Sequence, residues 1–292
     1  MPSNTLRTIG VVGAGQMGRG IAQVAAQSGF AVLLSDQNRP IVDAALQAID
    51  ASLMRQVEKG KLQPGARAET LGRIRPAVEP AALSGADFVI EAVSEDPTLK
   101  SRVFEALDAT CRPGVILASN TSSLSITRIA AATRRPERVI GMHFMNPVPV
   151  MELVEIVAGQ STSAETIETT RGLAKRLGKT AVAAQDYPGF ISNRILMPMI
   201  NEAICALHEG VGSRDDIDAV MRLGMRHPMG PLALADFIGL DTCLAIMEVL
   251  HQGFGDPKYR PCPLLRRMVD AGLLGRKSGR GFYEYGAEGT PR

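Results

Sequence analysis

The chain has 292 residues, which exceeds the usual size of a single hydrophobic core, so we expect two domains. Its composition is ordinary for a globular protein, with 45% hydrophobic residues and a formal net charge of +2. That charge, together with an aromatic content of only 4%, gives no reason to expect nucleic acid as a partner. The four cysteines and four histidines are scattered without metal-ligand spacing, so we predict no metal site.

No apolar stretch reaches the length that a membrane-spanning helix needs. The first ten residues, MPSNTLRTIG, also lack the basic and apolar regions of a signal peptide. The cysteines lie far apart in the sequence, as reduced thiols of a cytosolic protein do. We therefore expect a cytoplasmic protein with no membrane partner.

A glycine-rich motif directly follows the first predicted strand, residues 8–12. Helical spacing begins within the motif, as it does in the strand–turn–helix unit of a dinucleotide site. In such a unit Gly13 permits the tight turn, Gly15 lets the backbone approach the pyrophosphate, and Gly18 lets helix and strand pack closely. The free N–H groups of the helix start then face phosphate. The candidate cofactor-binding residues of this turn are Gly13, Gly15, Gln16, Met17 and Gly18.

An acidic residue, Asp36, stands at the tip of the second predicted strand, residues 31–35. A carboxylate at that position accepts hydrogen bonds from a ribose 2′-hydroxyl and repels a 2′-phosphate, which favours NAD over NADP. The nearby Arg39 leaves NADP open, and a simple turn residue is the alternative interpretation of Asp36.

Residues 41–75 have a charged helical pattern that is interrupted at residues 63–65. Lys59 and Lys61 flank this break. Lysine is a common point-charge ligand of phosphate, so both are candidates for a phosphate contact. Solvated lysines at a helix end are the alternative.

Two apolar runs, residues 87–93 and 115–119, suit buried parallel strands. Glu95 follows the first run, and four consecutive polar residues follow the second. Ligands of open α/β sheets bind at the carboxyl ends of the strands, so these residues are candidates for holding cofactor and substrate. Capping of a helix near Ser125 is the alternative. The four polar residues are Asn120, Thr121, Ser122 and Ser123.

The stretch GMHFMNPVPVMELVEIV contains a histidine at the end of a predicted strand, residues 138–144. A second predicted strand, residues 151–157, returns after two prolines that stiffen the connection. His143 and Glu155 can therefore lie side by side as a base and its orienting carboxylate. The alternative is a structural histidine beside a surface glutamate.

The alternation of strands and helices ends after a last predicted strand, residues 179–184. We expect a Rossmann-type, doubly wound and mainly parallel α/β sheet in residues 1–185, the NAD-binding domain. An all-helical domain is expected in residues 186–292, with Asn193 near the start of its first helix. The predicted helices of this domain span residues 190–209, 214–222, 232–251 and 264–272.

Seven motifs, spread in order over nearly the whole chain, carry a resemblance to the 3-hydroxyacyl-CoA dehydrogenase family. The block around the histidine and its neighbours is far more specific than the glycine motif. The residues after Tyr285 match no motif of the family, and we expect them to fray. The motifs are GAGQMGRGIA, EAVSED, SNTSSLSIT, HFMNPVPVMELVEI, DYPGFISNR, GPLALADFIGLD and GRKSGRGFY.

The resemblance implies NAD as cofactor, an acyl-CoA substrate, and a C-terminal helical domain that forms a homodimer. It implies that His143 is the catalytic base, with Glu155 as its partner. Ser122 and Asn193 are then the polar residues around the reacting 3-hydroxyl and the thioester carbonyl. Cofactor contacts are implied for Asp36, Glu95, Lys100 and Asn120, and further substrate contacts for Asn146, Lys59 and Lys61.

The reaction implied by the resemblance is reversible oxidation of an (S)-3-hydroxyacyl-CoA, of short chain such as 3-hydroxybutanoyl-CoA, to the 3-oxoacyl-CoA. A dehydrogenase of a free hydroxyacid is one alternative, and the absence of lysine between Lys179 and Lys258 counts against it. A gulonate-type relative and a non-catalytic NADH-binding relative remain as further alternatives. Retention of the whole set of candidate site residues argues against the non-catalytic one.

Overall fold

The computed structural model describes residues 5–78 and 80–286 of the chain. The chain divides into two compact units, residues 1–187 and residues 188–292. Residues 287–292, part of the tail for which we predict fraying, lie outside the described range. None of the helices in the described ranges is long and apolar enough to cross a membrane.

The N-terminal unit contains one eight-stranded sheet in the order β3-β2-β1-β4-β5-β6-β7-β8. Neighbouring strands run parallel throughout, except for the antiparallel pair β6–β7. This confirms the predicted mainly parallel, doubly wound sheet. The strands are β1 Thr8–Val12, β2 Ala31–Ser35, β3 Ile74–Pro76, β4 Phe88–Glu91, β5 Ile116–Ser119, β6 Val139–Phe144, β7 Leu153–Ala158 and β8 Thr180–Gln185.

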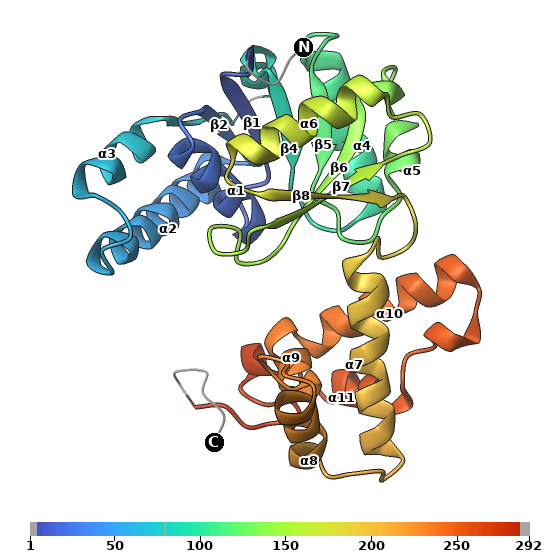
Figure 1. Cartoon of the computed structure of the whole chain (residues 1–292). Coiled ribbons are helices and arrows are strands. Elements are labelled where there is room, and N and C mark those ends of the chain that lie inside the picture. The colour runs from blue at the N-terminus through green and yellow to red at the C-terminus, as the bar shows by residue number, and fades with distance from the viewer. Residues whose placement is uncertain (1–4, 79, 287–292) are drawn as a thin grey trace. The chain divides into compact units, whose positions relative to one another are not determined.

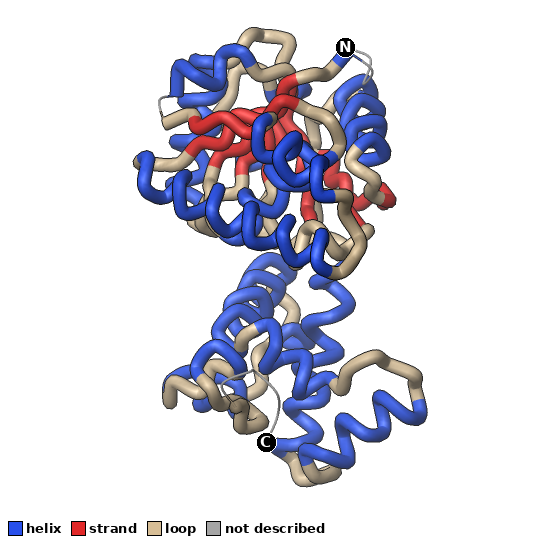
Figure 2. Tube along the Cα trace, turned by 90° about the vertical axis from the view of Figure 1, so that its left-hand side faces the viewer, coloured by secondary structure: helices blue, strands red, loops and turns tan. Residues whose placement is uncertain are grey.

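Helices cover both faces of this sheet (Figure 2). One hydrophobic core joins α1, α2 and α6 to one face, while α4 and α5 lie over the other (Figure 1). The helix predicted over residues 41–75 is wrong at its end, because the chain leaves the helix and adds β3 beside β2. The helices are α1 Gln16–Gln27, α2 Arg39–Glu58, α3 Pro64–Gly72, α4 Pro97–Thr110, α5 Ile126–Ala130 and α6 Ala164–Arg176, with short 3₁₀ turns η2 Pro80–Gly85 and η3 Pro136–Arg138.

Side-chain caps begin several of these helices at defined residues. Asn38 accepts a hydrogen bond from the backbone of Ile41 at the start of α2, and Asp96 accepts one from Leu99 at the start of α4. Each cap satisfies one of the backbone donors that a first helical turn leaves unpaired. No side chain caps α1, whose N-cap is Gly15. The backbone N–H groups of this first turn therefore have no side-chain acceptor at the N-cap position.

The C-terminal unit is helical, as predicted, and its core joins α7, α9, α10 and α11. The single helix predicted over residues 232–251 is wrong, because Gly239 has a φ of +103° and separates α9 from α10. A helical residue needs a negative φ, so the chain has to start a new helix there. The elements are α7 Ser192–His208, α8 Arg214–Ala219, π-helical η4 Val220–Gly224, α9 Pro231–Ile238, α10 Leu240–Phe254, η5 Pro257–Tyr259, α11 Pro263–Asp270 and η6 Arg276–Ser278.

A buried aspartate fixes the end of the described chain to this helical core. Asp236 in α9 accepts hydrogen bonds from the backbone N–H groups of Phe282 and Tyr283 and from the hydroxyl of Tyr285. Burial raises the pKa of Asp236, against the opposing effect of these hydrogen bonds. The segment that carries the GRGFY sequence is thereby part of the folded unit.

Candidate active site

The glycine motif forms the turn between β1 and α1. Gly13 has a φ of +97°, and a Cβ there would lie 2.6 Å from the carbonyl oxygen of Ala92. A Cβ on Gly18 would lie 1.6 Å from the carbonyl oxygen of Gly13, whereas a Cβ on Gly15 would meet nothing within 4 Å. Gly13 and Gly18 are therefore required by the fold itself, and Gly15 leaves room above the start of α1.

Asp36, at the tip of β2, is hydrogen-bonded to this turn. One carboxylate oxygen accepts from the N–H of Ala14 at 2.6 Å, and the other accepts from the N–H of Gln37 at 2.7 Å. Arg39, which left NADP open in the sequence, forms an ion pair with Asp43 at 2.7 Å. The turn and the acid together have the form of an NAD site, with phosphate at the start of α1 and ribose at Asp36.

His143 and Glu155 face each other directly across the antiparallel pair β6–β7. The distance from Nδ1 of the ring to Oε2 of the carboxylate is 2.7 Å. Both residues are buried, with exposed fractions of 7% and 1%. An ionised carboxylate can only accept a hydrogen bond, so a neutral ring paired with it in this way has its hydrogen on Nδ1 and its lone pair on Nε2. The structure therefore brings the predicted base and its predicted partner within hydrogen-bond distance, an arrangement that favours the tautomer with a free lone pair on Nε2 for a base.

Glu95 organises the polar loop that follows β5. Its Oε1 accepts hydrogen bonds from the hydroxyl of Thr121 at 2.5 Å, from the N–H of Ser122 at 2.9 Å and from the N–H of Ser123 at 3.2 Å. The hydroxyl of Ser122 donates to the same oxygen at 3.3 Å. Burial raises the pKa of Glu95, but the charge of Lys100 and these hydrogen bonds outweigh it and lower the pKa overall.

Lys100 lies beneath this loop and is fully buried. Its Nζ lies 2.7 Å from a carboxylate oxygen of Glu91 and 3.3 Å from one of Glu95. Sequence reasoning overlooked Glu91, whose other oxygen accepts a hydrogen bond from the hydroxyl of Ser119 at 2.6 Å. A glutamate at the end of an otherwise apolar strand was the available signal, because a buried charge requires a buried partner.

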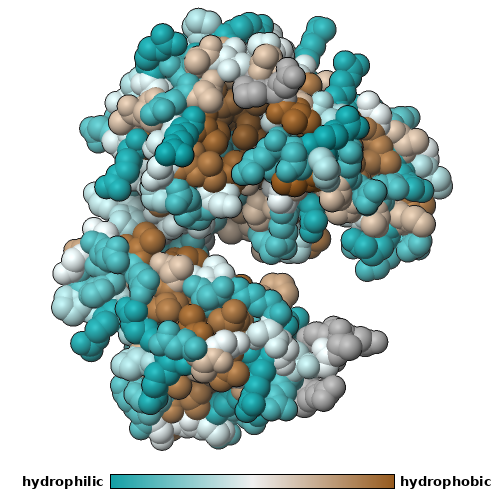
Figure 3. Space-filling view, turned by 180° about the vertical axis from the view of Figure 1, so that it is seen from behind, coloured by the Kyte–Doolittle hydropathy of each residue, from teal (hydrophilic) through white to brown (hydrophobic). Residues whose placement is uncertain are grey.

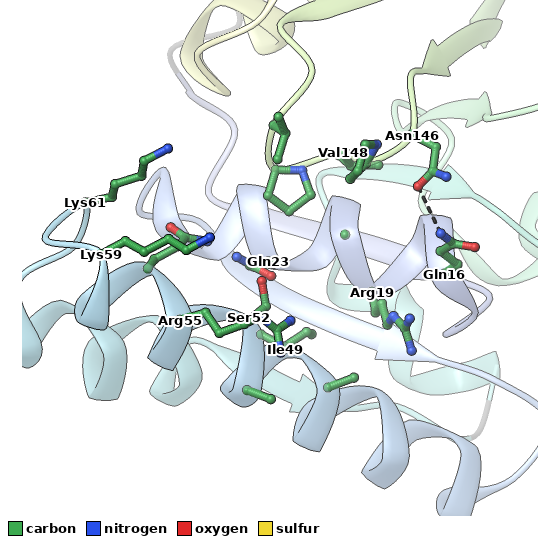
Figure 4. A pocket seen from close by; sticks show the side chains of 17 residues that line it. Gln16, Arg19, Gln23, Ile49, Ser52, Arg55, Lys59, Lys61, Asn146 and Val148 are labelled. Carbon is green, nitrogen blue, oxygen red and sulfur yellow. Dashed lines mark hydrogen bonds between the residues drawn. The ribbon is translucent and has the colours of Figure 1, made fainter. Parts of the chain in front are cut away.

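Two predicted asparagines connect neighbouring segments around the histidine. Oδ1 of Asn120 accepts a hydrogen bond from the N–H of Phe144 at 2.9 Å, which fixes the end of β6 beside the end of β5. Oδ1 of Asn146 accepts one from the side chain of Gln16 at 3.1 Å, which joins the loop after β6 to the start of α1 (Figure 4). Asn193, in the C-terminal unit, is buried in the first turn of α7, where its N–H donates to the carbonyl of Gly189.

A groove with a volume of about 710 Å³ lies between α1, α2 and the loop of residues 146–150. Lys59 and Lys61 line it, as do two arginines that sequence reasoning overlooked, Arg19 and Arg55 (Figure 4). Arg55 lies in the last turn of α2 and Lys59 is the C-cap four residues later, a spacing that could have indicated the cluster. Four basic side chains around one cavity suit an anion with several phosphate groups.

Two family models match the chain over almost its full length. Residues 8–187 match the NAD binding domain of 3-hydroxyacyl-CoA dehydrogenase, and residues 189–285 match its C-terminal domain. The chain belongs to the 3-hydroxyacyl-CoA dehydrogenase family. Its N-terminal unit is therefore the NAD-binding domain of that family, in agreement with the turn at Gly13 and with Asp36.

Individual relatives agree with this assignment. The chain is 58% identical, over 96% of its length and 98% of the relative's, to a probable 3-hydroxybutyryl-CoA dehydrogenase of Bacillus subtilis. It is 53% identical, over 98% of both chains, to a 3-hydroxybutyryl-CoA dehydrogenase of Bradyrhizobium diazoefficiens. The crystal structure of (S)-3-hydroxybutyryl-CoA dehydrogenase PaaH1 from Ralstonia eutropha superimposes with a TM-score of 0.94 at 50% identity, covering 97% of this chain and 100% of that one.

The different surroundings of the glycines predict different effects of two alanine variants. Gly18→Ala should lower the Tm by roughly 5 °C or more, because its Cβ would collide with the backbone at Gly13. Gly15→Ala should keep the wild-type Tm but bind NAD roughly tenfold more weakly or worse, because the added methyl group occupies the approach of the pyrophosphate. Thermal unfolding and NADH fluorescence titration of both variants measure this. A similar loss of Tm in both would contradict the division of roles.

Proposed function

We propose that the protein catalyses the reversible, NAD-dependent oxidation of short-chain (S)-3-hydroxyacyl-CoA, such as 3-hydroxybutanoyl-CoA, to 3-oxoacyl-CoA. The observation that carries the proposal is the buried hydrogen bond between His143 and Glu155, in the same unit as the dinucleotide turn. The names of the relatives support the acyl-CoA substrate and its short chain over a gulonate-type or free hydroxyacid substrate.

In the proposed mechanism, Nε2 of His143 takes the proton of the substrate's 3-hydroxyl group. Glu155 holds the ring in the required tautomer and stabilises the imidazolium as it forms, as the acid of other histidine–carboxylate pairs does. Bound NAD supplies the acceptor for the hydride that leaves C3. Ser122 and Asn193 bind the 3-hydroxyl and the thioester carbonyl, and Asn120 keeps the end of β6 in place.

Replacement of the base gives a direct test. His143→Gln should lower kcat for acetoacetyl-CoA reduction by about 10²–10⁴-fold, because the reaction loses its positioned proton donor and acceptor. NADH binding should stay close to wild type, since the substituted side chain belongs to β6 and not to the glycine turn. Steady-state kinetics and NADH fluorescence titration measure the two effects separately.

Two further measurements complete this test. Glu155→Gln removes only the charge of the partner, so its kcat should also fall while the protein still binds NADH. Acetoacetyl-CoA and a gulonate-type substrate should be assayed side by side with the wild-type enzyme. Retention of more than about a tenth of the wild-type kcat by His143→Gln would refute the role of the base. Turnover of the gulonate-type substrate alone would refute the proposed substrate class.

The basic groove suits the phosphate groups of coenzyme A. Lys59→Ala should raise KM for acetoacetyl-CoA roughly tenfold, because a charge-assisted contact to phosphate is lost. The matched control is the N-acetylcysteamine thioester of acetoacetate, which has the same reacting end but no phosphate. Its KM should not change in the variant. An equal rise of KM for both thioesters would show that Lys59 does not act through the phosphate groups, and would contradict the prediction.

We propose further that two copies of the chain associate through the C-terminal unit. Val211, Val220 and Leu223 are exposed large apolar residues there, and Leu223 is exposed to 78%. Val211 and Val220 line an apolar pocket of about 480 Å³, together with residues of α7 and α8, and Leu223 belongs to the same η4 segment as Val220. Hydrophobic side chains are visible on the surface of this unit in Figure 3. Large exposed apolar patches are uncommon on monomers and mark interaction sites.

A charge placed in this patch should separate the copies. Leu223→Asp should reduce the mass in solution to that of one chain, because burial of an unpaired carboxylate opposes association. Met54→Asp is the matched control, since Met54 is an exposed apolar residue of the N-terminal unit. Sedimentation of both variants and of the wild type decides the matter. A dimer that survives Leu223→Asp, or a wild-type monomer, would contradict the proposed interface.

A further inference from the structure

Two carboxylates and one ammonium group form a buried ionic network at the carboxyl end of β4. Lys100 lies between Glu91 and Glu95, at 2.7 Å from the first and 3.3 Å from the second. The side chains of Glu91 and Lys100 are 0% and 1% exposed, and that of Glu95 is 36% exposed. With both carboxylates and the ammonium group ionised, the network carries a net charge of −1. Glu95 is the member of the network that is most exposed to solvent.

Glu95 is held in its ionised form. The charge of Lys100 and the hydrogen bonds from the loop outweigh burial, which by itself raises the pKa, so the pKa of Glu95 lies below its usual range. The backbone N–H groups of Ser122 and Ser123 donate to the same carboxylate. A protonated Glu95 would accept these hydrogen bonds less well. The uncompensated charge is thus a property of the folded site at neutral pH.

The network lies on the side of the sheet where we expect the nicotinamide half of the dinucleotide to bind. The glycine turn after β1 and Asp36 after β2 identify the half of the sheet that binds the adenosine end. In a doubly wound sheet the other half of the cofactor lies over the remaining carboxyl ends, here those of β4, β5 and β6. Glu95 follows β4, so it stands on the nicotinamide side.

We propose that this network sets the preference of the site for oxidised over reduced dinucleotide, and that Glu91 is a positioning residue that acts on the cofactor through Lys100. NAD⁺ and NADH share the adenosine and the pyrophosphate, but the nicotinamide ring is positively charged only in NAD⁺. A nearby negative charge therefore attracts the oxidised form selectively. The inference rests on the proposed dehydrogenase function.

Glu91 matters because it takes up part of the charge of Lys100. With Glu91 neutralised, Lys100 would pair with Glu95 alone, and the network would carry no net charge. The fully buried Glu91 would thereby change the cofactor preference without touching the cofactor. General damage to the fold would weaken the binding of NAD⁺ and NADH to a similar extent, and would leave the ratio of their dissociation constants unchanged.

The test compares dissociation constants of NAD⁺ and NADH for the full-length protein at neutral pH and low salt. In Glu91→Gln the ratio of the NADH constant to the NAD⁺ constant should fall by roughly fivefold. Glu91→Asp, which keeps the charge, should restore the ratio. Glu95→Gln, at the solvent edge of the network, should shift the ratio in the same direction. This variant replaces Glu91→Gln in the test if Glu91→Gln does not fold.

Asp108→Asn is the matched control for loss of a buried carboxylate in the same unit. Asp108 is buried and pairs with Arg135 at 2.6 Å near the end of α4, away from the carboxyl ends of the strands. Its variant should lose stability but keep the wild-type ratio. An unchanged ratio in Glu91→Gln and Glu95→Gln would overturn the inference. Failure of the wild-type protein to bind either dinucleotide would instead overturn the proposed function, and the inference with it.

Discussion

The antiparallel pairing of β6 with β7 is the constraint on which the rest of the site depends. Every other neighbouring pair of the sheet runs parallel. Only at this pair does the chain reverse direction directly after one strand and pair with it, and that strand carries His143. The register sets Glu155 directly opposite His143, and a slip by one residue would turn the carboxylate to the other face of the sheet. Because both groups are buried, their hydrogen bond compensates part of the cost of removing them from water, so the pairing and the fold stabilise one another.

The carboxyl ends of the parallel strands gather the remaining polar groups at one edge of the sheet. Asp36 follows β2, Glu95 follows β4, Asn120 and Ser122 follow β5, and His143 lies near the end of β6. Apolar strands bring these groups together, and hydrogen bonds within the edge fix their orientation. Asn120 shows the principle, since its side chain continues the hydrogen bonding of β5 to β6 beyond the last paired residues.

Local signals in the sequence predicted most of this arrangement. Apolar runs indicated the strands, and the spacing from Gly13 to Asp36 indicated the dinucleotide turn, because both features depend on residues close together in the chain. The three residues of β3 are too few to show a period. The break at Gly239 was hidden because apolar spacing continues on both sides of it, and one glycine does not by itself end a helical pattern.

The interactions that the sequence did not reveal depend on tertiary packing. Glu91 could not be assigned a partner, because Lys100 approaches it only after α4 has packed beneath the loop. Arg19 likewise joins the basic groove only because α1 packs against α2. Nothing in the spacing of these residues relates them, since their proximity is created by the sheet and its helices.

In the proposed function, a single segment of the chain serves both ends of the substrate. It begins at His143, where the 3-hydroxyl is oxidised, and continues through Asn146 to Val150, which line the groove assigned to the coenzyme A phosphates. The hydrogen bond between Asn146 and Gln16 joins this segment to the start of α1, where the dinucleotide phosphate binds. Binding of the remote phosphates can therefore position the reacting carbon, because energy from the far end of a substrate is available to orient the near end. A helix that borders the substrate groove along its side and meets the cofactor at its start keeps the two ligands in a fixed relation.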